Sequence, residues 1–243
     1  MFLSKLFPVL KSRGEFLMIL AEGLKRIAPY VGKRFSEFLD SKQLLDLHTN
    51  KGNVGQILEL LIGLPNSSRR LDFEDGELKT NKCDRSGNPK ETIFITQVGT
   101  RLDEVLARNP FEESYIFHKI RNVIYVPVCK EGSEASWMFL PCIHVNLEEK
   151  RFNELRTQLE RDYYKIVDQL KQHIESSPDG YIHTSNGSFI QVRSKDSQPY
   201  NPIYSQIYGR YVSNKNHAFY FKKEFMKYLQ DVSPLYPFRS NDG

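Results

Sequence analysis

Apolar residues recur at helical spacing in several stretches of the chain. Steps of three and four residues predict helices over residues 16–27, 35–39 and 51–63, the last entered through glycines. The longest predicted helix covers residues 146–176 and ends at an SSPDG turn. Its apolar stripe indicates core packing rather than a partner-binding face.

Other stretches have the character of strands and turns. Residues 122–128 form the clearest buried-strand run, and a Ser-Gly-Asn-Pro turn leads into a β-branched strand that begins near Glu91. Between residues 72 and 140 we expect alternating turns and strands. Asn186-Gly187 predicts a hairpin that joins strands at 181–183 and 189–193.

The tyrosine-rich segment of residues 199–211 shows neither the helical nor the strand period of apolar residues, and is predicted to be an irregular loop. Its aromatic side chains could contact DNA bases, or they could pack with their hydroxyls in water. Both interpretations remain open.

A length of 243 residues suits one α/β or α+β domain, or two closely packed lobes. The net charge of +4 is mild for a nucleic-acid-binding protein, so any basic surface has to be local. Three scattered cysteines indicate a reducing compartment. Charged residues interrupt the apolar N-terminus, so we expect no membrane association and a cytoplasmic location.

The segment DFEDGELK, residues 72–79, has the composition of a hydrolytic metal site. Glu77 and Lys79 lie two residues apart, which places both on one face of a strand, and Asp72 can fold back toward them across the bend at Gly76. Mg²⁺ prefers oxygen ligands of this kind. Taken alone, the pattern is weak evidence and more often marks a surface hairpin.

Glu59 lies within the apolar pattern of the helix at residues 51–63, but off its main stripe. A carboxylate held against a core usually has a partner or a cation. The alternative is a solvated helix glutamate, and the sequence favours neither.

Six sequence blocks follow one another in a family order: KGxVGxxLE, DF with GELKT, GxPxET, HKxxxVxxxPV, QxRxK and FYxKK. In this order, from about residue 44 to 229, the chain resembles the MutH-type endonucleases. That family comprises the methyl-directed mismatch-repair nickase and related type II restriction enzymes that cut at GATC. The resemblance implies an α/β, restriction-endonuclease-like PD-(D/E)xK core, with a mixed sheet flanked by helices and two lobes around a DNA cleft. We expect one domain, 1–243, with a catalytic lobe of about 1–140 and a DNA-reading lobe of about 141–243.

The resemblance also assigns roles in catalysis. It implies that Asp72, Glu77 and the backbone carbonyl of Leu78 hold Mg²⁺, with Mn²⁺ as a possible substitute. Lys79 would be the catalytic lysine. Glu59 would complete the site, and Lys119 would be a further basic residue at the scissile phosphate.

A second set of residues is expected to contact double-stranded DNA. Arg193, Lys195 and Tyr220 match the family's reading arm, and Arg and Lys are suited to guanine because they donate to O6 and N7. The other expected contacts are Lys51, Arg69, Arg70, Glu91, His118 and Lys222.

Three departures bear on the biological role. The gap between Asp72 and Glu77 is shorter than in the mismatch-repair branch, the segment 101–114 differs from that branch, and residues 1–30 match no block. They favour a type II restriction enzyme that reads GATC, a monomer that could dimerise on DNA. The alternatives are a repair nickase stimulated by a matchmaker ATPase, and a non-catalytic DNA-binding module.

Overall fold

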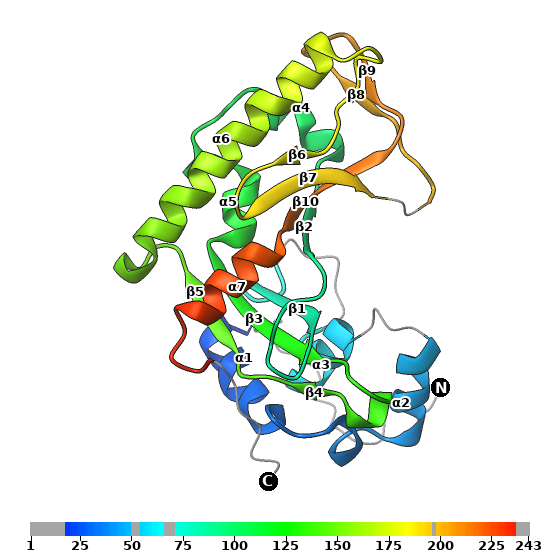
Figure 1. The fold of residues 1–243 in the computed structure, drawn as a ribbon, viewed down its shortest axis with the longest axis vertical. Coiled ribbons are helices and arrows are strands. Elements are labelled where there is room, and N and C mark those ends of the chain that lie inside the picture. Colours follow the sequence, from blue (N-terminus) through cyan, green and yellow to red (C-terminus); the bar gives the residue numbers. More distant parts are fainter. Residues whose placement is uncertain (1–17, 50–53, 66–70, 196–197, 237–243) are drawn as a thin grey trace, which may run out of the picture.

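The computed structural model describes residues 18–49, 54–65, 71–195 and 198–236, which build two main sheets with helices packed against them (Figure 1). In sheet A, β1 (Glu77–Cys83) runs parallel to β3 (Asn122–Cys129). The other edge of β3 pairs antiparallel with β4 (Met138–Phe139) and β5 (Ile143–Asn146). Sheet A is therefore mixed, and the predicted mixed sheet flanked by helices is confirmed.

Sheet B is antiparallel and occupies the other half of the molecule (Figure 1). Its strands, in spatial order, are β2 (Ile93–Gln97), β10 (Asn216–Phe221), β7 (Ile190–Lys195) and β6 (Ser185–Asn186). A separate two-stranded sheet consists of β8 (Ile203–Ser205) and β9 (Arg210–Ser213). The neighbouring strands β2 and β10 come from distant parts of the chain, so sheet B forms only when these two parts of the chain come together.

Three helices pack with sheet A: α1 (Leu20–Ile27), α2 (Ser41–Thr49) and α3 (Val54–Ile62). Helix α3 buries Val54, Leu58 and Ile62, which are four residues apart and so share one face. These side chains join the core cluster of Ile124 and Val126 from β3. The apolar period predicted for residues 51–63 thus places α3 beside the central strands.

Helix α6 (Asn153–Ser176) lies along sheet B, as the long yellow-green helix of Figure 1 shows. It buries Leu155, Leu159, Ile166, Leu170 and Ile174, so its stripe belongs to the core. The remaining helices are α4 (Leu102–Leu106), α5 (Tyr115–Ile120) and α7 (Lys223–Asp231). Short 3₁₀ turns occur at Ala28–Tyr30, Phe35–Glu37, Gly99–Arg101, Phe111–Glu113, Glu134–Ser136 and Lys150–Phe152.

Several predicted elements were wrong. The segment 72–140 contains α4 and α5, which are too short to show a clear helical period. Helix α6 begins at Asn153 rather than 146, because Asn146 ends β5 and a turn followed by the 3₁₀ turn Lys150–Phe152 occupies the residues between. The predicted strand at 181–183 is absent, and β6 is a shorter strand just after it. Residues 199–211, predicted to be irregular, contribute to the β8–β9 hairpin.

The buried residues form two large clusters. One surrounds β3 and α3, and the other includes residues of β2, α4 and α5 together with α6, β7 and β10. The second cluster thus draws on chain before residue 140, while the functional division into a catalytic and a DNA-reading lobe stays a prediction. None of the helices in the described part of the chain combines the length and the apolar character that a membrane span requires.

Candidate active site

A tight turn before β1 sets the position of Asp72. Its Oδ2 accepts a hydrogen bond of 2.9 Å from the backbone N–H of Leu78, while Phe73 N donates to Gly76 O at 2.9 Å. A Cβ on Gly76 would lie 2.5 Å from the backbone oxygen of Asn122, which starts β3. Only glycine allows this approach, so the turn brings Asp72 back over the first residues of β1.

Glu77 and Lys79 point to the same side of β1, as their spacing predicts. The ammonium of Lys79 contacts Glu77 Oε2 and lies 3.8 Å from Asp72 Oδ2, so it bridges the two carboxylates. The other oxygen of Glu77 lies 2.5 Å from Nζ of Lys119, which α5 supplies. Glu77 is only 2% exposed, and a charge so deeply buried needs partners of this kind.

Two carboxyl groups of this cluster, those of Glu59 and Glu77, have raised pKa values. Burial raises the pKa of Glu77, an effect that Lys79 opposes and Asp72 reinforces. Burial also raises the pKa of Glu59, on α3, to about 7, and the nearby charge of Asp72 adds to this. Perturbed carboxyl groups of this kind are typical of functional sites. Glu59 thus belongs to the same electrostatic cluster as Asp72 and Glu77.

The cluster is chemically suited to a hard divalent cation. Its donors are carboxylate oxygens; burial raises the pKa values of Glu59 and Glu77, the charge of Asp72 adds to this, and a cation would stabilise the ionised carboxylates. Within the described part of the chain, no three His, Cys, Asp or Glu side chains converge so as to hold a metal ion by themselves. One or two carboxylates with water and a substrate phosphate are the usual set for Mg²⁺. Asp72, Glu77 and the carbonyl of Leu78 fit that requirement.

The second predicted group lies together on one face of sheet B. The guanidinium of Arg193 lies 4.4 Å from the ring centroid of Tyr220, and Nζ of Lys195 lies 4.8 Å from that of Phe94. The rings of Phe94 and Tyr220 meet edge to face at 5.8 Å. Thr92 accepts a hydrogen bond of 3.0 Å from Arg193. Two cations are thus held over two aromatic rings; we call Phe94, Arg193, Lys195 and Tyr220 the reading-face cluster.

Phe94 was missed in the sequence. It is 39% exposed, unusual for so large an apolar ring on a central part of the fold. The available signal was the alternation of β2, in which Ile93 and Ile95 are buried and Phe94 points outward. An outward aromatic residue in a strand predicted to be half-buried is a candidate for ligand contact.

The other predicted DNA contacts lie apart from this cluster. Glu91 accepts a hydrogen bond of 2.9 Å from the backbone N–H of Lys82, which ties a turn to β1. His118 lies on α5 next to Lys119 and contacts the ring of Phe117. Lys222 donates to the carbonyl of Gly187 at 3.1 Å and so supports the turn before β7. Lys51, Arg69 and Arg70 lie outside the described residues. The roles of all these residues in DNA contact stay predictions.

Comparisons with known proteins agree with this arrangement. A family model described as "DNA mismatch repair enzyme MutH" matches residues 62–138, which include Asp72, Glu77, Lys79 and Lys119. The protein named DNA mismatch repair protein MutH from Haemophilus influenzae is 26% identical over 242 residues, 89% of this chain and 98% of its own length. Proteins of the same name from Vibrio cholerae and Buchnera aphidicola are each 27% identical, over 84% and 80% of this chain and 91% and 87% of their own. The chain is thus similar to proteins named MutH over most of its length, and the resemblance predicted from its ordered sequence blocks is confirmed.

Proposed function

We propose that this chain is a divalent-metal-dependent DNA endonuclease that nicks one strand, in the manner of a mismatch-repair nickase. The observation that carries the proposal is the convergence of Asp72, Glu77, Lys79 and Lys119 at the start of β1. The relatives described above all carry a mismatch-repair name. They support the repair nickase better than the type II restriction enzyme that the sequence departures favour.

The side chains of this chain would divide the work of phosphodiester hydrolysis. The ammonium of Lys79 lies between the two carboxylates, where it can orient the attacking water or donate to a phosphate oxygen. Lys119 approaches Glu77 from the opposite oxygen and supplies a second positive charge for the phosphate. Glu59, with its pKa of about 7, can accept or release a proton near neutral pH.

Asp72, Glu77 and the carbonyl of Leu78 would hold the cation, which we propose to be Mg²⁺ with Mn²⁺ as a substitute. A divalent ion bound there supplies the positive charge that polarises the scissile phosphate. The buried position of Glu77 keeps this carboxylate fixed on a strand rather than on a loop, which favours a defined geometry.

The reading-face cluster would supply recognition of double-stranded DNA. Arg193 and Lys195 can donate to base edges or phosphates, and the rings of Phe94 and Tyr220 hold both cations in place. We propose GATC as the site, which is the sequence that the family resemblance implies.

Plasmid digestion tests the proposal and separates its rivals. The substrate is a covalently closed plasmid with a mismatch and one hemimethylated GATC, incubated with Mg²⁺, with and without a matchmaker ATPase of the mismatch-repair type. We expect nicked circles, formed much faster with the partner. Full-length linear plasmid without the partner would establish restriction, and salt-sensitive DNA binding without any strand scission would establish a non-catalytic module.

A further inference from the structure

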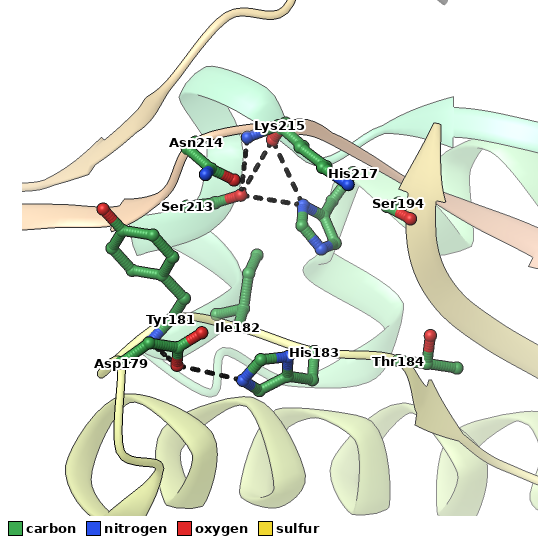
Figure 2. A pocket seen from close by; sticks show the side chains of 10 residues that line it. All are labelled: Asp179, Tyr181, Ile182, His183, Thr184, Ser194, Ser213, Asn214, Lys215 and His217. Carbon is green, nitrogen blue, oxygen red and sulfur yellow. Dashed lines mark hydrogen bonds and ion pairs between the residues drawn. The ribbon is translucent and has the colours of Figure 1, made fainter. Parts of the chain in front are cut away.

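A cavity of ≈480 Å³ lies at one end of sheet B, and its lining residues do not include Asp72 or Glu77 (Figure 2). Its walls come from the segment that leaves α6, from the end of β7, and from the turn between β9 and β10. Its polar and charged lining includes Asp179, Thr184, Ser194, Asn214, Lys215 and His217. A volume of this size is within the range of small-molecule sites.

The cavity opens on the opposite side of sheet B from the reading-face cluster. Ser194 lines it and lies between Arg193 and Lys195 in β7, so alternation directs its side chain to the other face. His217 is the direct partner of Ser194 in the antiparallel register of β10 and β7. Both therefore face the cavity, and a ligand bound there would be separate from DNA on the other face.

His217 is the most informative residue of the cavity. It is only 5% exposed, and its Nδ1 lies 3.2 Å from the carbonyl oxygen of Lys215 and 3.1 Å from Oγ of Ser213. A carbonyl can only accept, so Nδ1 carries the proton. Nε2 is then a bare acceptor; it has no hydrogen-bond partner among residues 18–49, 54–65, 71–195 and 198–236, and Figure 2 shows the ring directed into the cavity.

Burial keeps His217 in this acceptor state, because it lowers the pKa of the imidazole. Nε2 opens on the cavity and can accept a hydrogen bond there, so a ligand group with an N–H or O–H fits opposite it. An anion is disfavoured there, since it would bring its own lone pairs toward Nε2 and toward the carboxylate of Asp179. That carboxylate already accepts from the backbone N–H of Tyr181 at 3.0 Å.

Other polar groups around the cavity are able to donate. The hydroxyls of Thr184 and Ser194 and the amide of Asn214 have no hydrogen-bond partner within the described part of the chain, and all three line the cavity. The carboxylate of Asp179 is already bonded to Ser177, Tyr181 and His183, so the acceptor that the site offers to a ligand is Nε2 of His217, beside several donors. Its complement is a ligand with one N–H flanked by carbonyl oxygens, which is the pattern of an imide.

We propose that this cavity binds a small uncharged molecule with an imide or lactam N–H, of which a uracil-type nucleoside is the representative. The N–H donates to Nε2 of His217, and the flanking carbonyls accept from the hydroxyls and the amide at the walls. Lys215 lies at the rim, where it can meet the sugar. The site does not depend on the endonuclease function proposed above, and binding can be measured without DNA or metal.

The test compares two probes that differ in this N–H alone: uridine, and N3-methyluridine, which lacks it. Isothermal titration or ligand-observed NMR with the full chain gives the two dissociation constants. Loss of the hydrogen bond to Nε2 of His217, with a methyl group in its place, predicts binding weaker by about tenfold or more for N3-methyluridine. Equal affinities, or no binding of uridine at any concentration that its solubility allows, would overturn the proposal.

Variants locate the site. His217→Phe keeps a ring but removes the acceptor, so uridine should lose its advantage over N3-methyluridine. Circular dichroism and the thermal midpoint show whether this variant folds. If His217→Phe does not fold, Ser194→Ala still tests the location, because it removes only a hydroxyl. We expect Ser194→Ala to weaken the binding of uridine severalfold. Ser188→Ala is the matched control, since Ser188 is an exposed serine before the same strand and does not line the cavity. Uridine binding that is unchanged in Ser194→Ala, or reduced as much in Ser188→Ala, would refute the location.

Discussion

Lys119 Nζ lies 2.5 Å from Glu77 Oε1, so a residue of α5 holds a buried carboxylate at the beginning of β1. Lys79 takes the other oxygen of the same carboxylate. Glu77 is therefore shared between two ammonium groups from different elements, and its position depends on both. The contributions of Lys79 and Lys119 to the nicking rate can therefore be measured separately, by replacing one lysine at a time.

The first prediction concerns the two lysines. Lys79→Met keeps the length of the side chain but removes the charge that bridges Asp72 and Glu77. We expect the single-turnover nicking rate to fall by about 10²-fold or more, the usual scale for loss of one electrostatic contributor. Lys119→Met should lower the rate in the same direction. DNA affinity, measured by fluorescence anisotropy, should change only a few-fold in both variants.

Lys82→Met serves as the control for these lysines. Lys82 is an exposed residue of the same strand, and its side chain points to the face opposite to Lys79 and Glu77. Its nicking rate should match that of the wild type. A wild-type rate in Lys79→Met would instead show that the catalytic assignment is wrong.

The second prediction concerns pH. The pKa of Glu59 rises from 4.5 to about 7 on folding, mainly by burial. Between these two values the folded protein binds a proton that the unfolded chain has lost, so stability falls as pH rises through this window. Glu59 is only partly buried, so solvent screening keeps the effect well below the roughly 3 kcal/mol that the full shift would give. In metal-free buffer, Glu59→Gln should gain stability relative to the wild type between pH 5 and pH 8. A difference in the free energy of unfolding that stays constant across this range would contradict the assignment.

The third prediction concerns metal binding without catalysis. A cation that binds the folded chain alone raises the thermal midpoint in proportion to the logarithm of its concentration. Mg²⁺ or Mn²⁺ should therefore stabilise the wild type, and Asp72→Asn should lose most of this increment. Differential scanning fluorimetry with a metal titration measures it.

Glu74→Gln is the matched control for the metal titration. Glu74 is exposed and lies in the same turn as Asp72, so the change removes the same charge two residues away. It should retain the metal-dependent increment. An equal loss in both variants would mean that the effect is one of general charge rather than of a site.

The spacing of residues along the chain was sufficient to predict part of the candidate site. The two-residue spacing of Glu77 and Lys79 requires a common face once the strand is formed, and Gly76 marks the bend that returns Asp72. Lys119 could be placed only through the family resemblance, because no local pattern relates α5 to β1. Phe94 was missed for a similar reason. Its partner Tyr220 is on β10, and pairing between β2 and β10 is a long-range event that no short window encodes.

The fourth prediction concerns the turn before β1. Gly76→Ala adds a Cβ that would lie 2.5 Å from the backbone oxygen of Asn122 and 2.7 Å from Cδ1 of Leu20. Backbone cannot yield as a side-chain tip does, so the turn must move; overpacking of this kind costs about 1–3 kcal/mol. We expect a lower thermal midpoint and a loss of nicking, because the turn also positions Asp72. Gly55→Ala, on α3, meets only a side-chain oxygen at 3.3 Å and should be close to neutral.

The last prediction distinguishes the roles of the reading-face cluster. Phe94 holds the ammonium of Lys195 at 4.8 Å but carries no charge itself. Phe94→Ala should weaken DNA binding by about two- to fivefold, the worth of an exposed cation–π contact, and should leave the slope of log Kd against log salt unchanged. Lys195→Ala should reduce that slope by about one if Lys195 neutralises a phosphate.

Exposed Val232, at the end of α7, provides the control, because Val232→Ala removes apolar surface outside the cluster. It should bind DNA as the wild type does. A Phe94→Ala variant with wild-type affinity for GATC duplexes would show that sheet B does not face the DNA. A changed salt slope in Phe94→Ala would mean that the ring orders more charges than Lys195, since the phenyl group releases no counterions itself.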